Sequence, residues 1–107
     1  MFSIIYITAG DLPGARKLGR ILVEERLAAC ANIFPITSIF RWKGNIEEAS
    51  EFGIMVKTRT EKVKVIEKRV KDIHSYEVPC VVSFKIDEGS LEYLEWINDS
   101  VSCQDEI

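Results

Sequence analysis

The sequence predicts an α+β fold in which helices lie on one side of an antiparallel sheet. Three observations favour it. β-Branched and aromatic residues gather in four segments, as they do in strands. Apolar residues recur three and four positions apart in three other segments, as they do on one face of a helix. The 107 residues contain no linker or internal repeat, so one domain over residues 1–107 is expected.

The first part of the chain predicts a strand, a helix and a second strand. Phe2 to Ala9 is rich in β-branched and aromatic residues. Asp11 follows as a helix N-cap, with Pro13 in the first turn. The apolar face of this helix comprises Ala15, Leu18 and Leu22. Ala29 to Trp42 is extended again, and Pro35 indicates an edge position or an irregularity.

The second part predicts two more strands and two more helices. Lys43-Gly44-Asn45 is a turn signal, and the third strand ends at Thr58. A helix opens at Thr60, with an apolar face of Val63, Ile66, Val70 and Ile73. Pro79 starts a fourth strand whose apolar side comprises Cys80, Val82, Phe84 and Ile86. Ser90 caps a last helix, whose apolar face comprises Leu91, Leu94, Ile97 and Val101.

This order, βαββαβ followed by a C-terminal helix, is typical of the ferredoxin-like arrangement. Its sheet is antiparallel and its helices cover one side. Right-handed crossovers place the first and third strands in the middle of the sheet.

The first strand is apolar on both of its sides, which a monomer with helices on one side does not explain. Phe2, Ile4 and Tyr6 alternate with Ile5, Ile7 and Ala9. Met55 and Val81 are expected to join the side that the helices leave uncovered. A contiguous apolar surface of this kind is typical of an interface between subunits, so we expect an oligomer. The alternative is that the terminal helix folds over this surface.

Composition excludes several classes of protein. Apolar residues make up 47% of the chain and charged residues 29%, which is typical of a globular protein. The net charge of −3 gives no general attraction to nucleic acid or to an anionic membrane. No apolar run is long enough to span a bilayer, and the N-terminus lacks the pattern of a secretory signal. We therefore expect a soluble cytoplasmic protein with reduced thiols.

Five sequence blocks resemble the CutA divalent-cation tolerance family, in that family's order and at its spacing. They are RLAACAN (26–32), TSIFRWKGNIEE (37–48), KTR (57–59), HSYEVP (74–79) and YLEWI (93–97). The resemblance implies a homotrimer of PII-like architecture, with sheets packed towards its centre, and a role in the response to divalent metal ions. Three positions depart from the family's pattern: Arg41 replaces an aromatic residue, Ser75 a proline and Cys80 an acidic residue.

His74, the only histidine, is the first candidate metal ligand. With the Glu77 carboxylate, and with a thiol such as that of Cys30, it could hold Cu(II) or Zn(II) weakly. The alternative is that His74 only caps the C-terminus of its helix. Some bacterial relatives resemble copper binders with three ligands, and the corresponding positions here carry Ile7, Ile73 and His74. One of the three ligands therefore remains.

The cysteines favour structural roles over metal binding. Cys30 follows two alanines where a helix packs on a strand, and Cys80 shares a strand face with apolar residues. Both are interpreted chiefly as small core residues. Cys103, near the C-terminus, is expected to be a free surface thiol.

The resemblance implies an inter-subunit cleft lined by Trp42, Lys57 and Tyr76, with Glu77 beside them. The alternative for Lys57 is an ordinary cross-strand pair with Glu48 or Glu51. A PII-like module that binds a small anionic ligand in this cleft, or a rigid trimeric scaffold, are the rival functions. The sequence has no nucleophile elbow, phosphate loop or HExxH motif, so we expect no enzyme.

Overall fold

The structure, a computed structural model, describes residues 1–101. Its strands are β1 (Phe2–Ala9), β2 (Cys30–Trp42), β3 (Asn45–Arg59) and β4 (Val81–Lys85). Its helices are α1 (Leu12–Glu24), α2 (Val63–Ile73) and α3 (Leu91–Ser100), with a short 3₁₀ turn, Thr60–Lys62, before α2. The α+β class and the predicted order of elements are confirmed.

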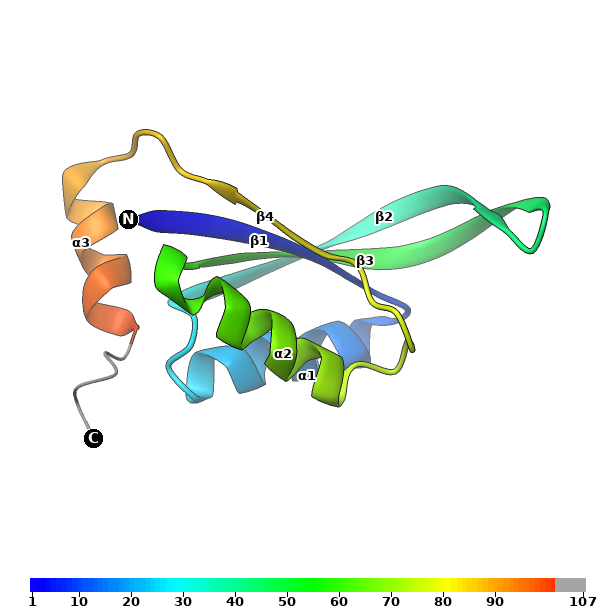
Figure 1. The fold of residues 1–107 in the computed structure, drawn as a ribbon, viewed down its shortest axis with the longest axis horizontal. Helices are drawn as coiled ribbons and strands as arrows, with labels where there is room; N and C mark the ends of the chain where they lie inside the picture. Colours follow the sequence, from blue (N-terminus) through cyan, green and yellow to red (C-terminus); the bar gives the residue numbers. More distant parts are fainter. Residues whose placement is uncertain (102–107) are drawn as a thin grey trace.

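The four strands form one antiparallel sheet in the order β2-β3-β1-β4. As predicted, the first and third strands are central. Helices α1 and α2 lie side by side against one face of this sheet (Figure 1). Between these layers lies the core, which includes Ile5, Ile7, Leu18, Leu22, Ile54, Val56, Ile66 and Val70.

Local signals in the sequence account for the start of α1 and its packing. The Asp11 carboxylate accepts a hydrogen bond of 2.7 Å from the backbone N–H of Gly14, as an N-cap does. The predicted apolar face of α1 is buried against the sheet. Glu25 follows α1 directly, and its carboxylate accepts two hydrogen bonds, of 2.9 and 2.7 Å, from the Arg69 guanidinium of α2. This bidentate pair joins the end of α1 to α2.

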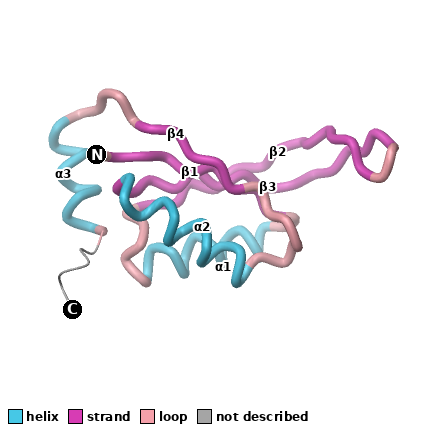
Figure 2. The backbone as a smooth tube through the Cα atoms, in the orientation of Figure 1, coloured by secondary structure: helices cyan, strands magenta, loops and turns pink. Residues whose placement is uncertain are grey.

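Strands β2 and β3 continue beyond the rest of the sheet. The pairing of β1 with β3 ends at Ala9 and Phe52, whereas β2 and β3 stay paired as far as Trp42 and Asn45. Residues 36–51, called the arm below, therefore form a two-stranded ribbon that projects from the body (Figure 2). At its tip Lys43 and Gly44 both have positive φ, of 50° and 83°, as in a two-residue type I′ turn.

Helix α3 packs at one end of the sheet, against the face opposite α1 and α2. Ile97 and Val101 are buried there with Ala29, and Phe2 and Cys30 pack against them. Leu91, predicted on the apolar face of α3, is 71% exposed, so that part of the prediction is wrong. The helix covers only this end of the face and leaves the part nearer the arm uncovered (Figure 1).

The prediction for the two sides of β4 is wrong. Cys80 precedes the strand and is exposed, so it is not a core residue. In the register with β1, Val82 lies opposite Tyr6 and Phe84 opposite Ile4. Both side chains therefore lie on the face that α1 and α2 leave uncovered, and Val81 packs into the helix-side core instead.

Candidate functional site

The sheet surface opposite α1 and α2, called the open face below, carries apolar side chains on all four strands. They are Ile4, Tyr6, Phe34, Met55, Val82 and Phe84, and the register also places the polar residues Thr8, Asn32 and Lys57 on this face. The rings of Tyr6 and Phe34 lie 6.4 Å apart across β3, where Gly53 stands between them. A Cβ at position 53 would come within 2.7 Å of the Phe34 ring, so the glycine makes room for this aromatic pair.

The open face is incompletely covered in a single chain. Val82 is 54% exposed and Phe84 48% exposed. Leaving large apolar side chains in water forgoes roughly 25 cal/mol for each Å² of apolar surface. An apolar surface of this extent is typical of an interface.

The arm carries further exposed apolar side chains, from both of its strands: Ile39, Phe40, Trp42 and Ile46. A two-stranded ribbon is at best marginally stable on its own in water. The arm and the open face are thus two apolar surfaces that remain partly exposed in the structure.

The His74 ring joins the end of α2 to β1. Its Nε2 lies 2.7 Å from the carbonyl oxygen of Thr8, and its Nδ1 lies 2.9 Å from the backbone nitrogen of Tyr76. A neutral imidazole that donates from Nε2 and accepts at Nδ1 satisfies both contacts. His74 is the C-cap residue of α2, in agreement with the predicted alternative to metal binding. Its ring, however, contacts other segments rather than the carbonyl groups of the helix.

Tyr76 contacts the base of the arm, where the arm joins the rest of the sheet. Its hydroxyl donates a hydrogen bond of 2.6 Å to the Glu51 carboxylate. This hydrogen bond, together with partial burial, raises the pKa of Tyr76 to about 12. A Cβ at Gly10 would lie 2.9 Å from the Tyr76 hydroxyl, so the turn after β1 must pass close to this side chain.

Lys57 lies at the other end of the sheet, under α3. Its ammonium donates a hydrogen bond of 3.2 Å to the Tyr93 hydroxyl and lies 5.3 Å from the centre of the same ring. The predicted alternative, a cross-strand pair with Glu48 or Glu51, is wrong. The partners of Lys57 across the sheet are Ile4 and Cys30.

The three residues predicted to line a cleft do not meet within one chain. Trp42 stands at the tip of the arm and is 59% exposed. Lys57 and the Tyr76 partner Glu51 are six residues apart on β3, about 20 Å at the usual rise of a strand. A shared cleft would require more than one copy of the chain.

The predicted metal ligands are also dispersed. Within residues 1–101, no three His, Cys, Asp or Glu side chains are grouped so that they could hold a metal ion. Cys30 is half-buried beside α3, and its thiol donates to the Asn32 side chain at 3.3 Å. Cys30 pairs with Lys57 of β3, whereas Thr8, whose carbonyl contacts the His74 ring, pairs with Gly53 of β3. These two positions are four residues apart along the strand, about 13 Å. Cys103 lies outside the described residues.

Glu77 lies near His74 in sequence but borders a different space. It lines a small cavity of about 200 Å³ together with Glu67 and Lys71 of α2. An imidazole with both nitrogens engaged and one carboxylate beside a lysine do not form a metal site within the part of the chain that the structure describes. Sequence reasoning missed the Glu51–Tyr76 and Lys57–Tyr93 contacts, because residues 25 and 36 positions apart give no local pattern.

Among residues 1–101, no helix has the length and hydropathy needed to span a bilayer. The CutA1 divalent ion tolerance protein family matches residues 3–100. The divalent-cation tolerance protein CutA of Archaeoglobus fulgidus is 48% identical over 101 residues, 94% of this chain and 99% of that protein. The Thermus thermophilus protein of the same name is 44% identical over 101 residues, again 94% of this chain and 98% of that protein.

Solved structures agree with these sequence matches. The structure described as the periplasmic divalent cation tolerance protein CutA from Archaeoglobus fulgidus has a TM-score of 0.93 and 47% identity, and the match covers 95% of this chain and all of that one. The divalent cation tolerance protein of Thermus thermophilus has a TM-score of 0.91 and 43% identity, with the same coverage.

Proposed function

The chain belongs to the CutA1 divalent ion tolerance protein family, and from that premise we propose that it acts as a homotrimer that binds divalent cations weakly. Copper is the first cation of the proposal and zinc the second. The role is non-enzymatic, and it is exercised by the assembled protein in the cytoplasm. A periplasmic location, as the Archaeoglobus structure is described, is the alternative.

The open face is the observation that supports assembly. Val82 and Phe84 belong to β4, whose more apolar side is turned away from α1 and α2. A strand that keeps its most apolar side away from its own core is favoured when a second surface covers that side. Other copies of the chain supply such a surface, because the arm adds exposed apolar side chains of its own.

The contacts of His74 support weak rather than tight binding of metal. A cation at Nδ1 must displace the hydrogen bond from the Tyr76 backbone, and one at Nε2 must displace the contact with Thr8. The free energy of coordination is reduced by that loss. His74 and Glu77 therefore need ligands from a neighbouring copy or from water to complete a coordination shell.

Assembly is tested by the change Val82→Glu, which places a charge on the open face. The matched control is Val65→Glu on α2, where the valine is 41% exposed on the outer side of the helical layer. Light-scattering mass is expected to be that of three 12.2 kDa chains for the natural protein and for the control. Val82→Glu is expected to give a smaller species. A natural protein that stays at the mass of one chain at micromolar concentration contradicts the proposal.

Metal binding is tested by copper titration of the untagged protein. Both His74→Ala and Glu77→Gln are expected to weaken binding, and the second leaves the imidazole contacts in place. Glu88→Gln, an exposed carboxylate elsewhere, is the control. Copper affinity that is unchanged in both variants would rule out these two residues as ligands.

A further inference from the structure

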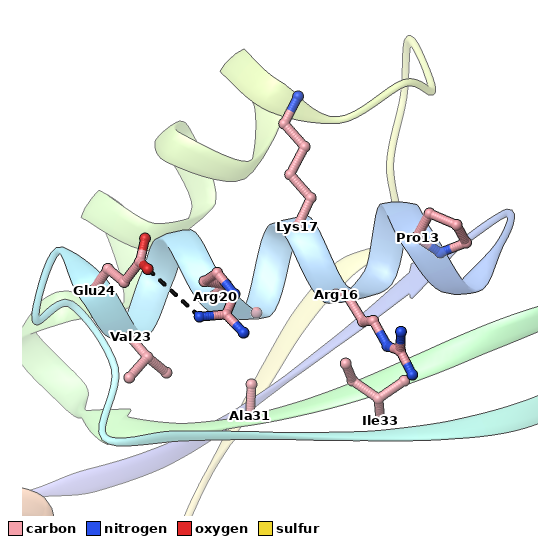
Figure 3. A pocket seen from close by; sticks show the side chains of 9 residues that line it. Pro13, Arg16, Lys17, Arg20, Val23, Glu24, Ala31 and Ile33 are labelled. Atoms are coloured by element: carbon pink, nitrogen blue, oxygen red, sulfur yellow. Dashed lines mark ion pairs between the residues drawn. The ribbon is translucent and has the colours of Figure 1, made fainter.

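A groove between α1 and β2 lies on the helix side of the sheet, away from the open face. Its volume is about 760 Å³, within the range of roughly 300–1,000 Å³ that is usual for small-molecule sites. Val23 of α1 and Ala31 and Ile33 of β2 face one another across it, with Pro13 at one end (Figure 3). One wall is β2, an edge strand of the sheet within the described chain.

Two arginines one turn apart on α1 border this apolar floor. The Arg16 side chain extends towards Ile33, and that of Arg20 lies beside Glu24 (Figure 3). The charged groups of Arg20 and Glu24 lie 3.7 Å apart and both side chains are exposed, so the ion pair between them is weak. Glu24 therefore competes only weakly with an incoming anion for Arg20. In the described part of the chain, Arg16 has neither a hydrogen-bond nor an ion-pair partner.

The helical layer as a whole is positive in a chain of negative net charge. Helix α1 and residues 60–73 hold eight of the fourteen basic residues but four of the seventeen acidic ones. Anions that approach this side of the molecule therefore meet a local attraction that the net charge of −3 conceals.

We propose that this groove binds a small organic phosphate, with its apolar or aromatic body against Ala31 and Ile33 and its phosphate on Arg16 and Arg20. Guanidinium groups match phosphate oxygens in geometry and charge. A terminal phosphate offers three oxygens, so two arginines one helical turn apart can both bind it. The groove lies within one chain, and the proposal does not depend on metal binding.

The test uses phenyl phosphate as the probe, with the full-length protein at about 0.15 M salt and amide chemical shifts as the readout. Saturable shifts are expected at groove residues such as Val23, Ala31 and Ile33. Inorganic phosphate and phenol, which each carry half of the proposed chemistry, are expected to bind at least about tenfold more weakly. Inorganic phosphate that binds as tightly as the probe would overturn the proposal, as would shifts confined to other surfaces or no shifts at all.

Paired variants separate the groove from general electrostatic attraction. Arg16→Gln with Arg20→Gln is expected to weaken binding at least about tenfold, because two charged hydrogen-bonding groups are lost. Lys64→Gln with Lys68→Gln removes the same charge from the same layer, and neither of these two exposed lysines of α2 lines the groove. That control is expected to weaken binding less than about threefold.

Equal losses in the two variants would mean that the anion is attracted only by the general field, and would overturn the proposal. If the double variant unfolds at too low a temperature for the binding measurement, the single change Arg16→Lys, which keeps the positive charge, replaces it in the test. It is expected to weaken phenyl phosphate binding several-fold, since an ammonium lacks the planar pair of donors. An unchanged affinity in Arg16→Lys would remove Arg16 from the site.

Discussion

At the scale of single residues, the contact between Tyr76 and Glu51 connects the segment after α2 to the base of the arm. The phenol is the donor, so only its neutral form makes the hydrogen bond. The folded state therefore holds the phenol proton more tightly than the unfolded chain does. With Glu51 ionised, the stabilisation is fully present below the ordinary tyrosine pKa near 10 and is lost as the pH rises towards about 12.

Absorbance at 295 nm gives a direct test, because the chain has three tyrosines. One of them is expected to ionise about two pH units late, and Tyr76→Phe is expected to remove that late step. Glu51→Gln removes the anionic acceptor and is expected to return the pKa of Tyr76 towards 10. Glu48→Gln, three positions away on the arm, is the control. A late step that survives in Glu51→Gln would contradict the assignment of cause.

Gly53 is the residue on which the aromatic pair of the open face depends. A methyl group there would come within 2.7 Å of Phe34 and 3.2 Å of Tyr6. Gly53→Ala is therefore expected to destabilise the fold by roughly 1–3 kcal/mol, although the same exchange in an unobstructed strand tends to stabilise. Denaturant unfolding measures the change. Combining it with Phe34→Leu, which removes the obstructing ring edge, should recover part of the loss in a double-mutant cycle.

At the scale of elements, the sequence is sufficient to predict the order of strands and helices, the capping of α1 and the central position of β1 and β3. These features depend on local chemistry and on short-range periodicity. The sides of β4 were assigned wrongly for a physical reason: alternation shows which side is more apolar, but not which layer covers it. Register with Tyr6 turns Val82 towards the open face. In a sheet with two apolar faces, the more apolar side of an edge strand need not face the helices.

The candidate site was less predictable than the fold, because it depends on contacts between distant segments. His74 was identified from residue type alone, while its bonds to Thr8 and Tyr76 follow from how α2 meets β1. For Lys57, the alternative to a place in the cleft is a carboxylate partner, because charge pairing across strands is common. Instead α3 folds over that end of the sheet and brings Tyr93 to it. Neither contact leaves a pattern in the sequence.

The arm is the element whose stability should depend most on assembly. No third strand among residues 1–101 pairs with residues 36–51, so their ribbon is marginal unless another surface covers it. Hydrogen exchange in Val82→Glu, if it is dissociated, is expected to be fast at arm amides such as that of Phe40. Exchange at Ile5 and Ile54 of the core should stay slow. In the assembled natural protein the arm is expected to be protected as well, and equal arm exchange in both proteins would contradict its place in the interface.

At the scale of the whole molecule, the proposed trimer predicts that thermal stability depends on protein concentration. If three chains fold together, unfolding releases three separate chains, and mass action favours the folded trimer at higher concentration. A hundredfold rise in concentration then adds about 1.8 kcal/mol of stability per chain. For a domain of this size, that corresponds to a rise in melting temperature of roughly 10 °C. Scans at about 2 and 200 µM measure it.

The Val82→Glu and Val65→Glu variants distinguish whether this concentration effect comes from assembly through the open face or from association through another surface. If assembly through the open face produces the effect, Val65→Glu keeps it and Val82→Glu loses it. The first charge lies on the outer side of the helical layer, whereas the second lies on the open face, opposite Tyr6. A concentration effect retained by Val82→Glu would mean that the chains associate elsewhere, and the apolar sheet surface would then need another occupant. A natural protein with one melting temperature at both concentrations would mean that its folding does not depend on other copies. The apolar open face would then have to be stable in water, at a cost that grows with every Å² left uncovered.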